Sequence, residues 1–300
     1  MSPTTHYHTV TLAARGGIDL AYAEAGDPTA PTLILLHGFP SSSNQYRHLI
    51  PALADKYRVL APDLPGFGST VVHSDPTNLT FSDLTDALEG FVDTLGVSHF
   101  GVYIFDYGAP TALRFALRRP AAITALITQN GNAYEEGLGA ALWAPVRTLW
   151  ATERGTPAFD EALAPLAGLL TFEATKRQYT LGTPAPLLDR IDPAAYALDQ
   201  ANNARSPETQ VGLLYDYRSN VALYPQFQAW LRESRVPVLA VWGRGDEIFV
   251  PAGAEAYARD AVDAEVHLLD GGHFLLETHV EAVAALIRTF LERVRFGQAA

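Results

Sequence analysis

Apolar, strand-like runs alternate with helix-like segments along the first 131 residues, and this alternation is the strongest constraint on the fold. The run TLILLHG (32–38) is predominantly apolar, which is typical of a strand buried on both faces of a parallel sheet. Similar runs follow at residues 58–63, 99–105 and 123–131, each separated from the next by a helix-like segment. This pattern predicts an α/β fold whose sheet is mostly parallel and flanked by helices.

The segments at the N-terminal edge have a different pattern. Residues 9–14 and 18–26 alternate polar and apolar side chains around Gly16 and Gly17, which predicts an antiparallel pair of strands. The predicted helices cover residues 42–55, 81–96, 107–120, 252–260 and 277–293, with Ser42 and Ser82 as N-caps of the first two.

The alternation of strands and helices is interrupted once. Residues 133–232 are helix-like and rich in Trp, Tyr, Pro and Ala, and strand-like runs return at 236–243 and 264–270. We therefore predict a core of residues 1–132 and 233–300, with eight strands, and an inserted helical cap of residues 133–232. Caps of this kind commonly cover active sites and exclude water from them.

Composition narrows the classes of partner and site. The formal net charge of −12 argues against nucleic acid or an anionic membrane surface as the main partner. Cysteine is absent, so a disulfide framework and a cysteine nucleophile are excluded, and no phosphate loop or histidine spacing indicates a metal or organic cofactor. No secretory signal is visible and the apolar runs are too short to span a bilayer, so we expect a cytoplasmic protein. Its oligomeric state, monomer or homodimer, is left open.

Three polar residues stand directly after predicted strands. Asp106 follows the strand at 99–105, Asp246 follows the strand at 236–243, and His273 follows the strand at 264–270. Because the carboxyl ends of parallel strands meet at one edge of a sheet, we expect these side chains to lie close together. An acidic nucleophile, an acid and a histidine in this arrangement indicate a catalytic triad.

Five motifs carry a family resemblance. They are LLHGFPSSS (35–43), APDLPGFGST (61–70), FDYGAP (105–110), VWGRGDEIFVP (241–251) and GGHFLLE (271–277). In combination the sequence resembles the α/β-hydrolases of the epoxide hydrolase and haloalkane dehalogenase branch over nearly its whole length. The resemblance implies the α/β-hydrolase fold, with an inserted helical cap and the triad in the order nucleophile, acid, histidine.

The turn that holds Asp106 departs from the serine-hydrolase pattern G-x-S-x-G. The matching residues run from Ile104 to Gly108, so that Ile104 replaces the first glycine and Asp106 replaces the serine. An aspartate is already ionised at neutral pH and can attack an activated sp3 carbon directly, which forms an ester. His273 is then expected to activate the water that hydrolyses this ester, while Asp246 holds the tautomer of His273.

The resemblance also implies an oxyanion hole. The family pattern places two backbone N–H donors there, from the residue after His-Gly and from the residue after the nucleophile, which are Phe39 and Tyr107 in this sequence. Pro40 matches a position that is often cis in this branch, which would aim the Phe39 amide.

The leaving group separates the two subfamilies. An epoxide oxygen needs a proton donor, and the motif DYRSN (216–220) resembles the cap segment that supplies one, which implies this role for Tyr217. The segment KRQYTLGTPAP (176–186) similarly implies Tyr179 as a second donor, with Tyr215 and Tyr196 as replacements. Epoxide hydrolysis to a vicinal diol is therefore the predicted function.

Dehalogenation of a haloalkane or haloacid by the same triad is the alternative. Haloalkane dehalogenases usually carry a tryptophan directly after the nucleophile and often an asparagine at the position of Phe39, and this sequence has neither. A non-catalytic binding protein with this fold is a third hypothesis. The apolar, aromatic cap predicts a small hydrophobic organic substrate. The residues expected to line its pocket are His37, Pro40, Trp143, Trp150 and Tyr215.

Overall fold

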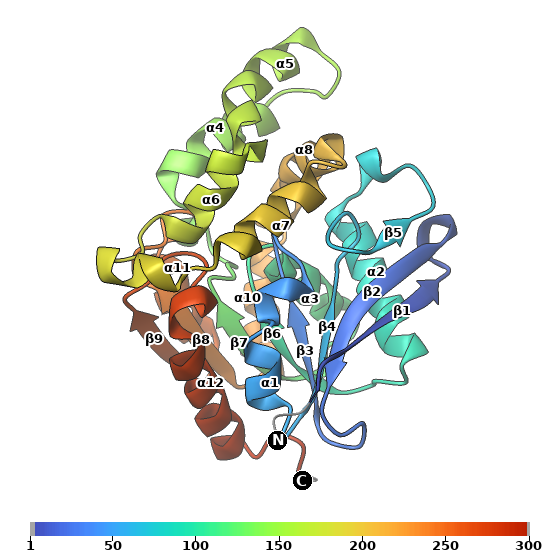
Figure 1. Ribbon diagram of the computed structural model, residues 1–300, viewed down its shortest axis with the longest axis vertical. Helices are drawn as coiled ribbons and strands as arrows, with labels where there is room; N and C mark the ends of the chain where they lie inside the picture. Colours follow the sequence, from blue (N-terminus) through green and yellow to red (C-terminus); the bar gives the residue numbers. More distant parts are fainter. Residues whose placement is uncertain (1–3, 299–300) are drawn as a thin grey trace.

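A central sheet organises the computed structural model, which describes residues 4–298 (Figure 1). The strands are β1 (His6–Leu12), β2 (Ile18–Ala25), β3 (Thr32–Leu36), β4 (Arg58–Pro62), β5 (Val71–Val72), β6 (Phe100–Ile104), β7 (Ile123–Gln129), β8 (Val238–Gly243) and β9 (Glu265–Leu269). Eight of them form one path in the order β1-β2-β4-β3-β6-β7-β8-β9. Residues 1–3 and 299–300 of the predicted core lie outside the described residues.

The sheet is mostly parallel, as the sequence predicts. β1 pairs with β2 and β2 pairs with β4 in antiparallel register, while every later neighbour along the path is parallel. The two-residue strand β5 pairs with β2, so within residues 4–298 the sheet has nine strands rather than the predicted eight. Its brevity explains the difference, because two residues give no periodicity that a sequence pattern could reveal.

Helices cover both faces of the sheet, which is why the central strands are mostly buried and mostly apolar. On one face α2 (Phe81–Thr94), α3 (Gly108–Arg118) and α11 (Ala252–Asp260) enclose a core cluster, and on the other face α1 (Leu49–Leu53) packs against α12 (Leu276–Arg293). All five residues of β6 are buried, and its side chains alternate between the two clusters.

Two predicted helix features are wrong in detail. The helix expected at 42–55 is divided into a 3-10 helix at Ser43–Tyr46 and the short α1, because Pro51 cannot donate to the carbonyl of Arg47 and would clash with it. The N-cap of α2 is Thr80 rather than Ser82, since Thr80 and Asp83 form a reciprocal capping box.

The chain between β7 and β8 is helical. It forms α4 (Ala140–Trp150), α5 (Pro157–Leu163), α6 (Phe172–Thr180), α7 (Pro193–Asn203), α8 (Pro207–Asp216), α9 (Arg218–Val221) and α10 (Tyr224–Ser234), joined in part by 3-10 helices. In Figure 1, α4 to α8 lie above the sheet, whereas α10 packs against the core helices α3 and α11. The division at residues 133 and 232 stays a prediction, and we keep the name cap for residues 133–232.

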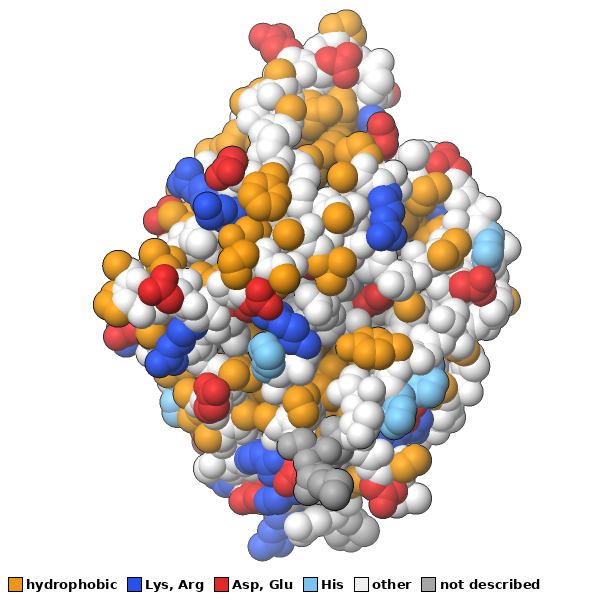
Figure 2. Space-filling view, in the orientation of Figure 1, with side chains coloured by type: hydrophobic (Ala, Val, Ile, Leu, Met, Phe, Trp, Pro, Cys, Tyr) orange, Lys and Arg blue, Asp and Glu red, His pale blue; other side chains and the backbone are white. Residues whose placement is uncertain are grey.

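The surface of the cap is partly apolar. Figure 2 shows hydrophobic side chains over its upper half, with acidic and basic side chains scattered between them. Phe172 on α6 and Leu198 on α7 are among the exposed apolar side chains, and Leu188 lies between these helices. Within residues 4–298 no helix has the length and hydrophobicity that a membrane crossing would require.

Candidate active site

Asp106 occupies a tight turn between β6 and α3. Its φ of 44° lies in the left-handed region, which is unfavourable for a residue with a side chain and is common at functional turns. The turn also requires glycine at two neighbouring positions. A Cβ on Gly108 would come within 2.1 Å of the carbonyl oxygen of Leu36, and one on Gly38 within 2.2 Å of Asp106 Oδ1. The glycines therefore allow the backbone to pack closely around the turn, and the turn presents the Asp106 carboxylate at the edge of the sheet.

One oxygen of the Asp106 carboxylate is held by the backbone. The N–H groups of Phe39 and Tyr107 both donate to Oδ1, each at a distance of 2.7 Å. These are the two residues that the sequence predicts as oxyanion donors, and the Phe39–Pro40 peptide bond is cis. Both backbone donors therefore contact Oδ1, and neither of them contacts Oδ2.

His273 stands between the two carboxylates. Its Nδ1 lies 2.7 Å from Asp246 Oδ2, and its Nε2 lies 3.7 Å from Asp106 Oδ2. The other oxygen of Asp246 accepts hydrogen bonds from the N–H groups of Ile248 and Phe249. The His273 Nε2 atom is buried and has no hydrogen-bond partner within residues 4–298. The structure thus brings Asp106, Asp246 and His273 together, with Nε2 facing the Asp106 carboxylate.

Burial and charge oppose each other in this group. Desolvation raises the pKa of Asp106 to about 6, against the lowering effects of His273 and of the Tyr107 and Phe39 N–H groups. For His273 burial acts to lower the pKa, but the carboxylates of Asp246 and Asp106 outweigh it and raise the pKa above its usual value. Asp106 is therefore mostly ionised at neutral pH, while its basicity is higher than that of an exposed carboxylate.

Two residues that support the triad are missing from the sequence predictions. Asn130 Nδ2 donates to Asp246 Oδ2 at 2.5 Å, and Asn130 Oδ1 accepts from the Gly243 N–H at 3.1 Å. Gln129 Nε2 donates to the carbonyl oxygen of His273 at 3.0 Å, which fixes the histidine loop. A usable signal existed in the sequence, because both residues end the run at 123–131 and so reach the same sheet edge as Asp106.

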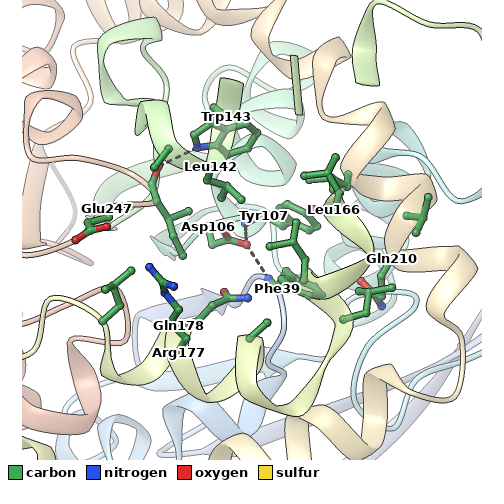
Figure 3. A pocket seen from close by; sticks show the side chains of 18 of the residues that line it. Phe39, Asp106, Tyr107, Leu142, Trp143, Leu166, Arg177, Gln178, Gln210 and Glu247 are labelled. Atoms are coloured by element: carbon green, nitrogen blue, oxygen red, sulfur yellow. Dashed lines mark hydrogen bonds between the residues drawn. The ribbon is translucent and has the colours of Figure 1, made fainter. Parts of the chain in front are cut away.

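A cavity of about 370 Å³ opens over Asp106 between the core and the cap (Figure 3). Its core side includes Phe39, Asp106 and Tyr107. Its remaining wall is mostly apolar and includes Leu142, Trp143, Leu163, Leu166, Leu169, Leu170, Leu181, Val211, Leu214 and Ile248. The size and lining suit a small hydrophobic molecule beside the Asp106 carboxylate.

Of the five residues predicted for the substrate pocket, Trp143 is the one that lines this cavity. The indole of Trp150 donates to the Leu214 carbonyl at 2.9 Å, and the Tyr215 hydroxyl donates to the Thr152 carbonyl at 2.6 Å. His37 is buried behind the turn. Its Nε2 accepts the Leu64 N–H, and its Nδ1 lies 3.1 Å from the Gly38 carbonyl oxygen, while the Pro40 carbonyl accepts from Asn203. These four residues are therefore placed by structural contacts outside the cavity lining.

The predicted proton donors also lie outside the lining. The hydroxyl oxygen of Tyr217 is 3.2 Å from that of Tyr224, and the Tyr179 hydroxyl donates to Asp199. Burial raises the pKa of both Tyr217 and Tyr179 well above the usual value, so both phenols stay protonated. Tyr196 packs edge-on against Tyr179. The catalytic roles of these tyrosines stay predictions.

Gln178 and Arg177 stand where a polar cap residue was expected. Both line the cavity, and the Gln178 amide points toward its centre near Asp106 and Phe39 (Figure 3). Arg177 and Glu247 are exposed residues of the lining and lie toward one side of it. Within the described part of the chain no group of three or more His, Asp or Glu side chains is placed to hold a metal ion.

Comparison with known proteins places the geometry in a family. Residues 31–280 match the family model described as "alpha/beta hydrolase fold". An uncharacterized hydrolase of Saccharomyces cerevisiae is 45% identical over 290 residues, which are 94% of this chain and 96% of that protein. Epoxide hydrolase 3 of Xenopus tropicalis is 26% identical over 291 residues, covering 92% of this chain and 75% of that protein.

Solved structures agree at the level of the fold. The haloalkane dehalogenase DbeA from Bradyrhizobium elkani superposes with a TM-score of 0.77, over 98% of this chain and all of that chain, at 22% identity. Taken with the sheet order and the Asp106 turn, these matches show that the chain belongs to the α/β-hydrolase fold family.

Proposed function

We propose that this protein hydrolyses an epoxide to a vicinal diol through a covalent ester on Asp106. The observation that supports the proposal most directly is that the two oxygens of the Asp106 carboxylate have different surroundings. Oδ1 is held by the two N–H donors from Phe39 and Tyr107, while Oδ2 faces His273 and the cavity. Attack by Oδ2 leaves Oδ1 as the ester carbonyl oxygen, already in the oxyanion hole.

The first step breaks a ring C–O bond. Asp106 Oδ2 bonds to a ring carbon, the ring oxygen leaves as an alkoxide, and this oxygen takes up a proton. Tyr217 and Tyr179 are the predicted proton donors, and use of either requires its hydroxyl to leave its present partner, Tyr224 or Asp199. The carboxylate requires no general base, since it is the ionised form that attacks.

The second step hydrolyses the ester. A water gives a proton to His273 Nε2 and adds to the carboxyl carbon of Asp106, and the negative charge on Oδ1 is stabilised by the Phe39 and Tyr107 N–H groups. Collapse of this intermediate expels the diol oxygen, which takes the proton back from His273. Asp106 is left as the acid and ionises, because its pKa of about 6 is below neutral pH, which returns the proton taken up in the first step.

Dehalogenation is the second candidate, and one observation favours it. The tyrosines expected to protonate an alkoxide do not line the cavity, and a halide leaves without a proton. Against it, no indole follows the nucleophile, and the Trp143 N–H donates to the Ile248 carbonyl at 2.8 Å instead of facing a halide. The 26% identity to a protein named epoxide hydrolase supports the first candidate.

A parallel substrate panel tests the proposal. Wild type, Asp106→Asn and the control Asp86→Asn, whose exposed carboxylate pairs with Arg118 on the protein surface, are incubated with epoxides and with bromoalkanes. We expect diol from wild type and Asp86→Asn, and a loss of at least about a thousandfold in Asp106→Asn, because an amide is a far poorer nucleophile.

Three results would contradict the proposal. Halide release without any diol would favour the dehalogenase, and equal activity in Asp106→Asn would remove the covalent mechanism. Saturable binding of these compounds by a wild type that converts none of them would favour a binding protein.

A further inference from the structure

Asp199 on α7 is a buried carboxylate that the proposed reaction does not use. Its side chain is fully enclosed, with an exposed fraction of 0%. The Tyr179 hydroxyl donates to its Oδ2, and the Ser41 hydroxyl donates to its Oδ1 at 3.3 Å. A buried carboxylate costs free energy and is retained in a cap helix where an amide or an apolar residue would be easier to bury.

The contacts of Asp199 connect the cap to the loop that carries the oxyanion donor. Ser41 is two residues after Phe39, whose N–H donates to Asp106. On the same helix α7, Asn203 donates to the carbonyl of Pro40 and, at 2.9 Å, to the carbonyl of Asp199. The segment 39–41 is therefore held from the cap by two side chains one helical turn apart.

A second set of contacts reaches the histidine loop. The ring of Tyr179 stacks on the ring of Phe274, with 3.8 Å between centroids and an interplanar angle of 11°. Phe274 directly follows His273 in the sequence. Asp199, by accepting the Tyr179 hydroxyl, thus fixes a ring that packs beside the general base.

The charged and titratable groups around Asp199 come from four elements. Burial is the largest influence and raises its pKa to about 7, the Tyr179 and Ser41 hydroxyls act to lower it, and the more distant Glu277 on α12 raises it. Arg47, after the 3-10 helix at 43–46, lowers it and is itself paired with Glu277 at 2.7 Å. The protonation state of Asp199 therefore changes near neutral pH.

We propose that Asp199, as the carboxylate, is a positioning residue that holds the 39–41 segment and Tyr179 for the ester-hydrolysis step. Two hydroxyl donors face its two oxygens, and the ionised carboxylate offers each hydroxyl an acceptor. Protonation converts one oxygen into a donor, so that one of the two hydrogen bonds has to reverse its direction or break. The kinetic part of this inference rests on the proposed covalent mechanism.

The central experiment compares Asp199→Asn with wild type from pH 5.5 to 9 in single-turnover decay of the Asp106 ester. We expect the variant to be slower than wild type by about tenfold at pH 8.5 and similar at pH 5.5, because the amide imitates the protonated acid. The control Asp192→Asn changes the N-cap of the same helix, and asparagine caps a helix as well as aspartate does. A pH profile of Asp199→Asn that coincides with wild type overturns the proposal.

Tyr179→Phe and Ser41→Ala separate positioning from chemistry. Tyr179→Phe keeps the stacked ring and removes the hydroxyl, and Ser41→Ala removes the loop contact. We expect both to slow ester hydrolysis at pH 8.5 and to combine with Asp199→Asn with less than additive effect, since they act through the same carboxylate. Fully additive effects, or slowing confined to ester formation, contradict the proposal and return Tyr179 to its predicted role as proton donor.

A substrate-free measurement keeps this test distinct from the proposed reaction. The folded pKa of Asp199 is raised above its unfolded value of about 4, so the folded chain binds more protons between about pH 4 and 7 and loses stability as the pH rises through this window. The Tm advantage of Asp199→Asn over wild type should therefore grow between pH 4.5 and 8, and a constant difference overturns the titration. If this shift occurs while no epoxide or haloalkane is converted, the proposed function fails and the titration of Asp199 stands.

Discussion

At the scale of single residues, the proposed reaction depends on the different contacts of the two Asp106 carboxylate oxygens. Two N–H groups donate to Oδ1, and His273 Nε2 approaches Oδ2 at 3.7 Å without a hydrogen bond. A histidine whose function was to deprotonate the nucleophile would donate to or accept from it directly, as in serine hydrolases. The wider separation suits a histidine that acts on a water between itself and the ester.

Replacement of His273 tests this assignment. In His273→Gln we expect the first step to continue and the second to stop, so that the Asp106 ester accumulates within one turnover. Intact mass spectrometry after incubation with an epoxide should show an increase equal to the mass of one substrate. His267→Gln is the matched control, because His267 lies on β9 and is partly exposed beside Glu265.

The outcome of this trapping experiment is clear in both directions. A substrate-sized adduct on His273→Gln that is absent from His267→Gln supports the two-step mechanism. An unmodified His273→Gln protein, with a substrate that wild type converts, contradicts it.

At the scale of elements, helix α6 brings Gln178 and Arg177, and not Tyr179, to the cavity. One face of α6 and the residue that follows the helix line the cavity, with Ala174, Arg177, Gln178 and Leu181 at the spacing of a single helix face. Thr175 and Tyr179 are buried on the other face. The residue that the motif implies, Tyr179, is therefore the neighbour in sequence of Gln178, whose side chain points toward Asp106. In-line attack places the leaving atom on the side of the carbon opposite Asp106, which is the cap side.

We therefore expect Gln178 to contact the leaving atom. Loss of a hydrogen bond to a charged group costs about 1.5–3 kcal/mol, so Gln178→Leu should slow ester formation by about ten- to a hundredfold. Gln226→Leu is the control, since Gln226 is exposed on α10. Pre-steady-state rates of ester formation, measured beside Tyr217→Phe and Tyr179→Phe, give the comparison.

The same measurement decides between the amide and the tyrosines. A loss of more than about threefold in Tyr217→Phe, with Gln178→Leu unchanged, would make Tyr217 the donor and would require its hydroxyl to leave Tyr224 during the reaction. The reverse result would assign the leaving-atom contact to α6.

At the scale of the whole molecule, the cap and the core enclose one apolar cavity above the sheet edge. Its wall comes from α4, from the segment between α5 and α6, and from α6 and α8, and its floor is the Asp106 turn (Figure 3). An apolar wall discriminates among substrates by the area that they bury. A cavity of about 370 Å³ is the size of site that holds a small organic molecule.

A homologous series of substrates tests this control of specificity. Burial of a methylene contributes about 0.8 kcal/mol, so kcat/KM for 1,2-epoxyalkanes should rise by up to about fourfold per carbon until the cavity is filled. Leu170→Ser, in the cavity wall, should weaken the dependence on chain length. Leu188→Ser, on the exposed cap surface, should leave it unchanged.

A flat dependence on chain length in wild type would show that the cavity wall does not contact the substrate. Equal effects of Leu170→Ser and Leu188→Ser would show that the cap responds as a whole, and that the cavity lining has no specific role.

The alternation of strands and helices along the chain, and the meeting of three polar side chains at one edge of the sheet, follow from the sequence alone. Each of Asp106, Asp246 and His273 ends a strand-like run, and parallel strands bring their carboxyl ends to one edge whatever the details of packing. Gly108 belongs to the same turn as Asp106, so the need for a glycine at this position also follows from the local sequence.

Tertiary structure alone decided which side chains surround the substrate. Periodicity defines two faces of α6 but does not say which face meets Asp106, so that the sequence indicated Tyr179 and the fold placed Gln178. Asp199 beside Ser41, and Asn203 beside Pro40, are pairs separated by more than a hundred residues. Contacts of that kind depend on how helices and loops pack against one another, and a single sequence contains no local pattern that specifies them.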